Sequence, residues 1–466
     1  MENYLFGKKI AYLSLGCKVN GYETEAIKEH FKGFGAEEVA FSEFADVYLI
    51  NTCTVTNIAD RKSRQMLRRA RKVNPDAVVV ATGCYVQEFF RNHEEDDLAD
   101  IYVGNRRKSE IAQILNGYYQ ACAEGGKVDR FYVNEDKELV GYEDMISVTT
   151  EGHTRAFMKI QDGCNQFCSY CIIPFARGRI SSRSEEEILK EAKLLSDSGY
   201  REIVVTGIHL SSYGLETLSL REQAALRPDK GELPLLLVLR RLAEIPGIER
   251  IRLGSLEPRI ITEDFARELS KIEKVCPHFH LSLQSGCDKT LRAMNRKYTT
   301  AEYAACVDIL RKYFDRPAIT TDMIVGFPGE SEEDFNESAS FAERIRFAQI
   351  HVFPYSRRKG TVADRMSGQH TDAVKRAREA VLLTKEHALR SAYAEQFLGT
   401  ETEVVVEELI TEDGITKGRG HDRRYLLYTF PLSEDLSGQI VTVIGTSVTT
   451  DCTIQAKKVD ISHKIG

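Results

Sequence analysis

Three closely spaced cysteines are the strongest chemical signal in this sequence. Cys164, Cys168 and Cys171 have the spacing Cys-x3-Cys-x2-Cys and directly follow an apolar run, Ala156–Ile160, that is typical of a buried strand. Three thiolates in one short loop can ligate three irons of a cubane 4Fe–4S cluster and leave the fourth iron open for a small molecule. A structural zinc ion needs a fourth ligand, and the loop contains no histidine. The spacing therefore favours a cluster with an open iron over a structural metal or free thiols.

A second group of cysteines is scattered in the sequence but shares one topological position. Cys17, Cys53 and Cys84 each follow an apolar run, and these runs are Ile10–Leu15, Val47–Ile50 and Ala77–Ala81. Sites in open parallel sheets form outside the carboxyl ends of the strands, so the three thiols are expected to converge. The alternative is that each is a small buried hydrophobe. Their shared position favours a second cluster, again without an evident fourth ligand.

The sequence patterns around these cysteines, which define the strands and helices that must position them, predict an α/β fold. Residues 1–118 are typical of an N-terminal parallel-sheet α/β domain, and residues 119–149 of a linker. Between 150 and 396, strands alternate with amphipathic helices, which predicts a partial (βα)6 barrel with its chemistry at the carboxyl ends of the strands. Residues 397–461 predict a small C-terminal antiparallel β-barrel. The predicted core strands are Ala156–Ile160, Glu202–Thr206, Arg250–Leu253, His278–Leu283, Ile319–Val325 and Ala348–Phe353.

Composition narrows the class of protein. The 466 residues include 63 Lys and Arg against 70 Asp and Glu, so the net charge of −7 does not by itself suggest a nucleic-acid partner. Eleven cysteines, an odd number, make a disulfide framework unlikely in a large chain without an export signal. No apolar run approaches the roughly 20 residues that span a bilayer. We therefore expect a cytoplasmic protein without a membrane partner.

The cysteine loop resembles the signature of radical S-adenosylmethionine (SAM) enzymes, and the predicted six-unit barrel is similar to their core. Over nearly its whole length the chain resembles the methylthiotransferases, and its C-terminal barrel resembles the RNA-binding TRAM domain found in that family. The stretches that carry this resemblance are Leu15–Asn20, Asn51–Thr56, Thr82–Tyr85, Val103–Asn105, Lys159–Gly178, Leu281–Gly286, Met294–Arg296 and Thr320–Glu330.

The resemblance implies two 4Fe–4S clusters and SAM as cofactors. SAM would bind the open iron of the cluster held by Cys164, Cys168 and Cys171, and its reductive cleavage would give a 5′-deoxyadenosyl radical. The cluster on Cys17, Cys53 and Cys84 would carry a sulfur that a first SAM methylates. The radical from a second SAM would activate a substrate C–H, where the methylthio group is inserted.

Three substrates compete within the family: isopentenyladenosine in tRNA, N6-threonylcarbamoyladenosine at position 37 of tRNA, and an aspartate of a ribosomal protein. Lys18–Asn20, Lys159–Cys164 and Thr206–Leu210 resemble the threonylcarbamoyladenosine branch. The isopentenyl branch usually has Gln-Met-Asn after the first cysteine and Glu before the Gly-Cys of the radical loop. The expected partners are the tRNA anticodon stem-loop and an electron donor such as a flavodoxin or ferredoxin, and the expected state is a monomer. An iron–sulfur protein that binds RNA without catalysis is the alternative from another class.

The expected SAM contacts come from the resemblance and from polar residues that end the predicted strands. Carboxylates and amides there could hold ribose hydroxyls, or could instead satisfy backbone groups of the barrel. Tyr170 is expected beside the cluster and adenine, although it could simply be packed. His209 could act in catalysis, in the substrate pocket or in packing. The expected contacts besides Tyr170 are Thr206, Gly207, Ser255, Glu257, Gln284 and Asp322.

Local basic charge supports the RNA hypothesis. A predicted helix that begins soon after Cys53 carries seven basic residues and no acid between 61 and 72, and Arg61, Arg64 and Arg68 are the proposed contacts. Arg177 and Arg179 could meet a substrate phosphate or carboxylate, or form structural ion pairs. The alternative for the basic groups is a solvated face. The proposed contacts in the C-terminal barrel are Lys417, Arg419, Arg423 and Arg424, beside the stacking rings Tyr425 and Tyr428.

Overall fold

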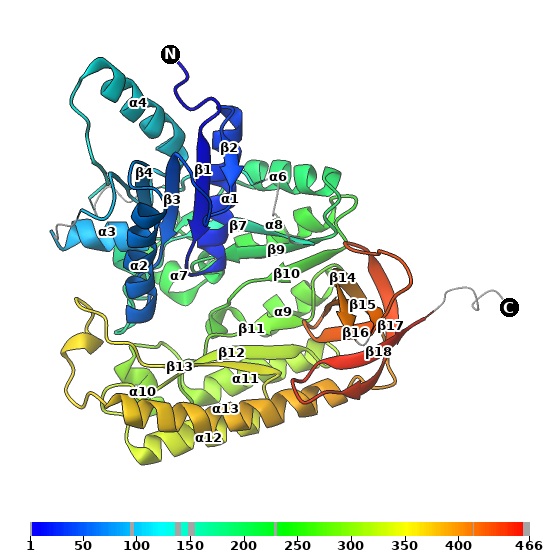
Figure 1. Ribbon diagram of the computed structural model, residues 1–466. Coiled ribbons are helices and arrows are strands. Elements are labelled where there is room, and N and C mark those ends of the chain that lie inside the picture. The colour runs from blue at the N-terminus through cyan, green and yellow to red at the C-terminus, as the bar shows by residue number, and fades with distance from the viewer. Residues whose placement is uncertain are drawn as a thin grey trace.

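The computed structural model describes residues 2–93, 97–135, 141–147, 154–227, 231–412 and 414–459. The N-terminal sheet (blue) packs above the central strands (green), and a long helix, α13 (orange), runs along the base (Figure 1). The small C-terminal barrel (orange to red) lies at one side of the central strands, so α/β architecture with a β-barrel is confirmed.

Parallel strands form the N-terminal sheet, in the order β2-β1-β3-β4-β5-β6. Alternate residues of the central strands divide between two hydrophobic cores: Leu49 packs with Phe31 of one helix, and Ile50 packs with Leu67 of another. Helices therefore cover both faces of the sheet, which explains the continuous apolar runs of its strands. The strands are β1 Lys9–Ser14, β2 Glu37–Val39, β3 Val47–Thr52, β4 Val78–Gly83, β5 Ile101–Val103 and β6 Phe131–Tyr132. The helices are α1 Lys18–Gly33, α2 Asn57–Val73, α3 Cys84–Arg91 and α4 Ile111–Glu124, with the 3-10 turn η1 Lys108–Glu110.

The central strands form a curled sheet in which β7, β9, β10, β11, β12 and β13 follow one another in sequence order, and the two-residue β8 pairs antiparallel with the outer edge of β7. One part has the order β10-β9-β7-β8 and the other β11-β12-β13. Parallel bridges from Ile251 to Val275 and from Leu256 to Leu281 connect the two parts. The strands are β7 Arg155–Asp162, β8 Ser181–Ser182, β9 Glu202–Gly207, β10 Arg250–Leu253, β11 His278–His280, β12 Ala318–Val325 and β13 Gln349–Pro354.

Helices alternate with these strands as their amphipathic patterns predict. Three of them begin with reciprocal caps, in which Ser219 pairs with Glu222, Thr299 with Glu302 and Ser331 with Asp334. The helices are α5 Ile173–Ala176, α6 Glu185–Asp197, α7 Leu220–Ala225, α8 Pro234–Ala243, α9 Glu263–Ser270, α10 Asp288–Ala293, α11 Thr300–Tyr313, α12 Glu332–Ile345 and α13 Asp372–Glu395. The 3-10 turns are η3 Leu210–Ser212, η4 Pro258–Ile260 and η5 Ala363–Arg365.

The C-terminal strands close into a barrel in the order β14-β15-β16-β18-β17. Its core contains Val404, Tyr428 and Val443, and it continues into Tyr393 and Phe397 at the end of α13. The barrel is therefore packed on the last turn of the long helix rather than tethered loosely. Its strands are β14 Glu401–Glu412, β15 Ile415–Asp422, β16 Leu427–Pro431, β17 Ile440–Val448 and β18 Ile454–Lys458.

A buried ion-pair network joins the N-terminal domain to the central sheet. The Glu23 carboxylate of α1 pairs with Lys108, with Lys159 at 2.7 Å and with Arg177 at 2.8 Å. Asp162 pairs with Lys159 at 2.6 Å and with Arg177 at 3.2 Å. Burial by itself would raise the pKa of Glu23, but the three cations hold it well below the ordinary value. The pKa of Asp162 is lowered by Lys159, Arg177 and a neighbouring arginine against the same effect of burial.

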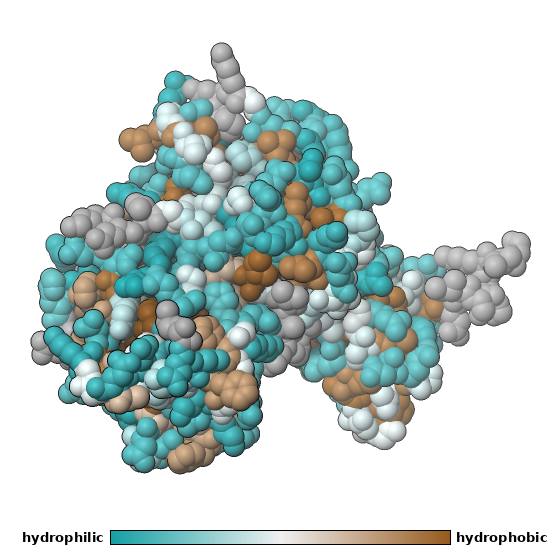
Figure 2. All heavy atoms as spheres, turned by 90° about the horizontal axis from the view of Figure 1, so that it is seen from above, coloured by the Kyte–Doolittle hydropathy of each residue, from teal (hydrophilic) through white to brown (hydrophobic). Residues whose placement is uncertain are grey.

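The surface seen from above is mostly hydrophilic, and its hydrophobic residues occur in small scattered groups rather than in one broad patch (Figure 2). Within the described residues, no helix is long and apolar enough to cross a membrane.

We predict that Glu23→Gln lowers the free energy of unfolding by about 3–5 kcal/mol, because it leaves the buried Lys108 without a carboxylate and Lys159 and Arg177 with Asp162 alone. Folded-state pKa values below the ordinary ones mean that these pairs stabilise the protein fully above about pH 5, begin to lose that effect below about pH 4, and lose all of it only when the pH falls through the lower folded-state pKa values. Urea unfolding followed by circular dichroism between pH 3 and 7 measures both effects. The control is Glu29→Gln, which removes a surface pair with Lys32 on the same helix, and should cost less than about 1 kcal/mol. Equal stability of Glu23→Gln and the wild type at pH 7 would contradict the assigned role.

Candidate active site

The loop that carries Cys164, Cys168 and Cys171 leaves the end of β7 through a glycine. Gly163 has a φ of +69°, and a Cβ added there would lie 1.9 Å from the Arg179 carbonyl oxygen. The Cys164 N–H donates to the Gly178 carbonyl at 3.1 Å, which closes the loop on itself. Only glycine fits at position 163, so the turn fixes where the loop begins.

The three thiols of this loop are partly buried and lie near one another. Burial, with the nearby Cys168, raises the pKa of Cys164 to about 12, and burial with Cys168 and Cys164 also raises that of Cys171. The Arg296 guanidinium lies 3.3 Å from the Cys168 sulfur. Partly buried, mutually close thiols that a cation faces are suited to a metal cluster, since coordination deprotonates a thiol that burial alone keeps neutral.

Tyr170 packs beside this loop. Its ring lies edge-on to Phe327 with centroids 6.4 Å apart, in a small core that also holds Met294 and Tyr355. Tyr170, in the loop after β7, thus packs against Phe327 in the segment after β12. A contact with adenine stays a prediction.

Cys17, Cys53 and Cys84 follow β1, β3 and β4, which are neighbours in the N-terminal sheet. Burial, with contributions from Cys84 and Cys17, raises the pKa of Cys53 to about 11, so the three sulfurs lie within electrostatic reach. Gly16 has a φ of +99°, and a Cβ there would lie 2.6 Å from the Cys53 sulfur. Cys17 caps α1 and Cys84 begins α3, so two helix N-termini face the group and favour negative charge.

One cavity of about 840 Å³ connects the two halves of the molecule. Gly16 and Cys17 line it from the N-terminal domain, whereas Thr206, Gly207 and Ser255 line it from the carboxyl ends of β9 and β10. Of the six predicted cluster cysteines, Cys17 is the one among the described lining residues, and Ile173 of α5 is the lining residue that follows the loop of Cys164, Cys168 and Cys171. That both cysteine groups serve one place stays a prediction.

Four of the expected SAM contacts, Thr206, Gly207, Ser255 and Asp322, line this cavity. Glu257 and Gln284 are not among its described lining residues. Glu257 is buried and accepts from the Arg259 guanidinium at 2.7 Å, and Gln284 forms a backbone bridge to Met323. The contacts of these two residues support the alternative stated above, in which they satisfy groups of the barrel itself.

Comparisons with known proteins agree with this architecture. The family model of the Radical SAM superfamily matches residues 158–342, and that of the uncharacterized protein family UPF0004 matches residues 9–104. The chain is 40% identical to the threonylcarbamoyladenosine tRNA methylthiotransferase MtaB of Bacillus subtilis (strain 168), over 93% of each protein. The chain belongs to the radical SAM methylthiotransferase family.

Other relatives and one solved structure are consistent with this assignment. MtaB of Aquifex aeolicus (strain VF5) is 39% identical over 87% of this chain and 95% of its own. A tRNA-2-methylthio-N(6)-dimethylallyladenosine synthase of Thermoanaerobacter sp. (strain X514) is 33% identical over 98% of this chain and 94% of its own. The radical SAM methyltransferase TsrM from Kitasatospora setae superposes with a TM-score of 0.53 at 14% identity, over 88% of this chain and 82% of its own, which supports the fold alone.

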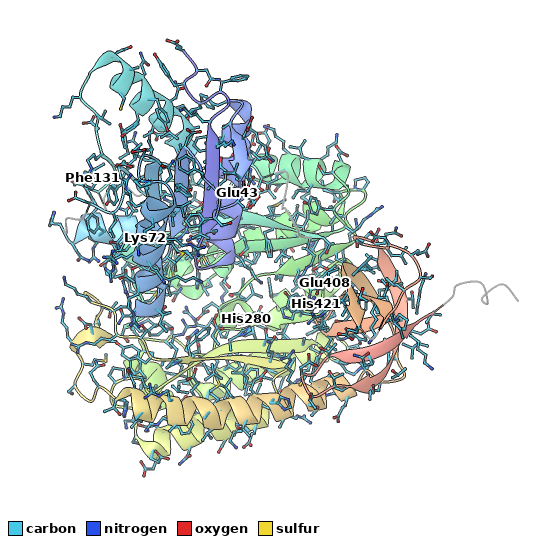
Figure 3. All side chains as sticks on the ribbon, in the orientation of Figure 1. Glu43, Lys72, Phe131, His280, Glu408 and His421 are labelled. Carbon is cyan, nitrogen blue, oxygen red and sulfur yellow. The ribbon has the colours of Figure 1, made fainter. Side chains whose placement is uncertain are left out.

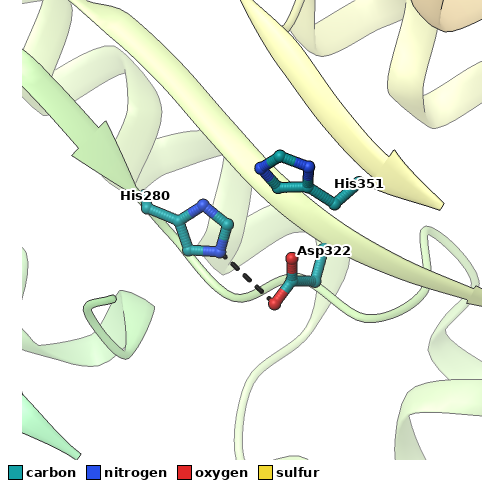
Figure 4. A group of neighbouring side chains, drawn as sticks. All are labelled: His280, Asp322 and His351. Carbon is teal, nitrogen blue, oxygen red and sulfur yellow. Dashed lines mark ion pairs between the residues drawn. The ribbon is translucent and has the colours of Figure 1, made fainter. Parts of the chain in front are cut away.

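The cavity of this methylthiotransferase also contains two histidines, His280 and His351, that the sequence did not predict, beside the predicted Asp322. His280, Asp322 and His351 project from adjacent strands β11, β12 and β13, with their ligand atoms within 4.8 Å of one another (Figure 4). His280 Nε2 lies 3.4 Å from the Asp322 carboxylate. His280 occupies the middle of the molecule, below the N-terminal sheet (Figure 3). Tyr425 of the C-terminal barrel reaches the same cavity, a placement that no local pattern in the sequence signals.

The predicted RNA contacts on α2 mostly remain accessible. Arg61 and Arg68 are exposed, whereas Arg64 pairs with Asp60 at 2.7 Å. In the C-terminal barrel, Lys417 and Arg419 pair with glutamates of β14 and stay at the surface. Their contact with RNA stays a prediction.

Arg177 is not a substrate contact. Its side chain is fully buried and pairs with Glu23 and Asp162, so the alternative of a structural ion pair is correct. Arg179, by contrast, is exposed, with its guanidinium 4.6 Å from the centre of the Phe167 ring.

Arg423, Arg424 and Tyr428 also need correction. Arg423 donates to the Val275 carbonyl at 3.2 Å, and Arg424 donates to the Asp315 carbonyl at 2.9 Å. Both arginines therefore anchor the C-terminal barrel to the central domain rather than face RNA. Tyr428 is fully buried in the core of the barrel and cannot stack on a base.

His209 is partly buried and is not among the described residues that line the cavity. Burial, with Arg296 and Arg259, lowers the pKa of its imidazole to about 3. Its Nδ1 lies 2.6 Å from the Ser212 hydroxyl, which supports a packed, neutral histidine.

We predict that Gly163→Ala disturbs the position of Cys164, because the added methyl group has no space and the φ is unfavourable. The iron content of the purified anaerobic protein should fall by about four per chain, the content of one cubane. The matched control is Gly199→Ala, which shares a positive φ of +90° but has no atom within 4 Å of the added Cβ. An unchanged iron content in Gly163→Ala would contradict this account.

Proposed function

We propose that this chain inserts a methylthio group at C2 of N6-threonylcarbamoyladenosine at position 37 of tRNA. The observation that carries the proposal is the shared cavity, which Cys17 lines from one domain and Thr206 and Gly207 from the other. The 40% identity to an MtaB enzyme over 93% of both chains supports this substrate over isopentenyladenosine, because tRNA-2-methylthio-N(6)-dimethylallyladenosine synthases of Thermoanaerobacter and Clostridium novyi are 33% and 32% identical.

Two cysteine groups with three ligands each suit two 4Fe–4S clusters. The cluster that Cys164, Cys168 and Cys171 would hold supplies the electron for reductive cleavage of SAM to a 5′-deoxyadenosyl radical. The cluster that Cys17, Cys53 and Cys84 would hold supplies the sulfur that is transferred.

The chain's own residues bind and orient the reactants. Backbone groups of Thr206 and Gly207 and the side chains of Ser255 and Asp322 line the place proposed for SAM. The Arg296 guanidinium, 3.3 Å from the Cys168 sulfur, stabilises negative charge on the thiolates. Ile208 and Leu253 line the same cavity with apolar side chains that exclude water from the reacting groups.

The RNA would approach past α2 and the C-terminal barrel. Arg61 and Arg68 on α2 offer exposed positive charge next to the segment that carries Cys53. Exposed guanidinium groups bind phosphates of any sequence, so this helix would position the anticodon stem-loop rather than read it. We further propose a cytoplasmic monomer that a flavodoxin or ferredoxin reduces.

Mass spectrometry of tRNA nucleosides from a strain that lacks this gene is the direct test of the substrate. The methylthio derivative of threonylcarbamoyladenosine should be absent from this strain. Expression of the wild-type gene should restore it, whereas expression of the Cys164→Ala gene should not. Full methylthiolation of threonylcarbamoyladenosine in the deletion strain would refute the proposal.

Gly16→Ala should selectively affect the N-terminal group, because the added Cβ would lie 2.6 Å from the Cys53 sulfur. We expect about four irons per chain instead of about eight, continued formation of 5′-deoxyadenosine, and no methylthio product. Gly21→Ala, in the first turn of helix α1 that follows Gly16 and with no atom within 4 Å of its added Cβ, is the control. Wild-type product from Gly16→Ala would argue against a sulfur-carrying role for these cysteines.

Arg68→Ala should weaken binding of the anticodon stem-loop and reduce the dependence of log Kd on log salt concentration by roughly one unit or less, as expected for one phosphate contact. Fluorescence anisotropy at several salt concentrations measures this slope. Arg201→Ala, at the opposite, amino end of β9, is the control and should leave the slope unchanged. An unchanged slope in Arg68→Ala would remove α2 from the RNA-binding surface.

A further inference from the structure

One wall of the cavity carries basic residues that the steps above do not use. Lys18 follows Cys17, His278 begins β11 and His351 lies on β13, and all three line the cavity. We name these three residues the cationic wall. They approach from two domains, so the cavity exists only when the domains are docked.

The charge on this wall is only partly compensated, because burial lowers the pKa of Lys18 while Tyr425 and Glu202 act on it in the opposite direction. Among the described residues that line the cavity, Asp322 is the one carboxylate. Arg252 is a further cation that lines the cavity, but its guanidinium already donates hydrogen bonds to Glu202 at 2.7 Å and to the Asp422 carbonyl at 3.1 Å. No carboxylate of the described residues forms an ion pair with Lys18, whose ammonium lies 5.7 Å from the centre of the Phe157 ring.

The members of the wall act on one another electrostatically. Burial and the charge of Arg252, His280 and Lys18 lower the pKa of His278 well below the ordinary value. Burial also lowers the pKa of His351, with His280 and Lys18 acting in the same direction against Asp322. His278 and His351 are therefore neutral hydrogen-bonding groups near pH 7, and Lys18 and Arg252 supply the positive charge that a bound anion would offset.

The histidines differ in what they can offer to a ligand. His280 is engaged at both ring nitrogens, by the Thr320 hydroxyl at 3.1 Å and by Asp322 at 3.4 Å. His278 Nδ1 is buried without a hydrogen-bond partner, and His351 is exposed to the cavity. Together with the Lys18 ammonium, these groups give two or three hydrogen-bond donors for one anionic group.

We propose that the cationic wall binds the carboxylate of the threonylcarbamoyl substituent and that Lys18 is the residue that selects an anionic N6 group. This inference rests on the proposed function. An apolar isopentenyl group would leave the Lys18 ammonium desolvated and unpaired, so the same wall that attracts the carboxylate discriminates against the uncharged substituent.

The test uses the reconstituted holoenzyme and two synthetic anticodon stem-loops. One carries threonylcarbamoyladenosine, and the other carries the same substituent with its carboxylate converted to a carboxamide. For the wild type we expect kcat/KM for the acid to exceed that for the amide by roughly 10- to 100-fold, as for a lost charge-assisted hydrogen bond. In Lys18→Met this ratio should fall close to one, mainly through a higher KM for the acid, and Lys18→Arg should restore part of it.

Lys62→Met is the matched control, because Lys62 is an exposed lysine on α2 outside the cavity. It should weaken both RNAs equally and leave the acid-to-amide ratio intact. His351→Gln is the second variant in case a change beside Cys17 disturbs the metal centre, and it should lower the ratio severalfold at wild-type iron content. A wild-type ratio in both Lys18→Met and His351→Gln would overturn the inference.

The same chemistry could serve the carboxylate of SAM instead of that of the RNA. Equilibrium binding of SAM to Lys18→Met should therefore match the wild type, and a loss of SAM affinity as large as the loss for the acid RNA would overturn the proposal. If wild-type enzyme that cleaves SAM modifies neither RNA, the proposed function fails and this inference with it. A stoichiometric zinc or manganese ion that is lost in His351→Gln would also overturn it, because His280, Asp322 and His351 would then form a metal centre.

Discussion

The buried ion pairs around Glu23 and Asp162 are the constraint on which the functional architecture depends. Glu23 belongs to α1 and Lys108 to the N-terminal domain, whereas Lys159, Asp162 and Arg177 belong to the central domain. Burial of each charge costs free energy of desolvation, which is offset only when its ion-pair partners are in place. The network therefore favours one docking geometry of the two domains over any displaced one.

The network also lies directly behind both cysteine groups. Asp162 precedes the Gly163-Cys164 turn, and its carboxylate accepts from the Gly163 N–H at 2.7 Å. Arg177, at the end of the same loop, donates to the Asn20 side-chain oxygen at 2.6 Å, and the Asn20 amide in turn donates to the Thr52 carbonyl next to Cys53. A single set of polar contacts thus fixes both loops relative to each other, and the shared cavity follows from that geometry.

The sequence predicted much of this arrangement because its signals are local. Apolar runs that end in cysteine identified β1, β3 and β4, and the Cys-x3-Cys-x2-Cys spacing identified the radical loop. β2, β5 and β6 were not predicted as particular strands, since segments of two or three residues carry no period. The predicted strand His278–Leu283 is regular only over His278–His280, and beyond it the pairing with β12 continues as an isolated bridge from Gln284, whose φ is +71°, to Met323.

What the sequence could not supply is the identity of partners that are distant along the chain. Arg177 was indistinguishable from a substrate-binding arginine until Glu23, 154 residues away, was seen beside it. Arg423 and Arg424 form a basic cluster in the sequence, yet they anchor one domain to another. Lys18 and Tyr425 lie more than 400 residues apart in the sequence and line the same cavity, which only the assembled fold reveals.

The central claim is that both cysteine groups act on one base in one cavity. It is tested most directly by mass spectrometry of the products formed from a stem-loop RNA that carries deuterium at C2 of threonylcarbamoyladenosine, with a variant in which Cys17, Cys53 and Cys84 are all alanine. The account predicts that this variant still transfers deuterium from C2 into 5′-deoxyadenosine but forms no methylthio product. Methylthio product from the variant, or 5′-deoxyadenosine without deuterium from the wild type, would contradict it.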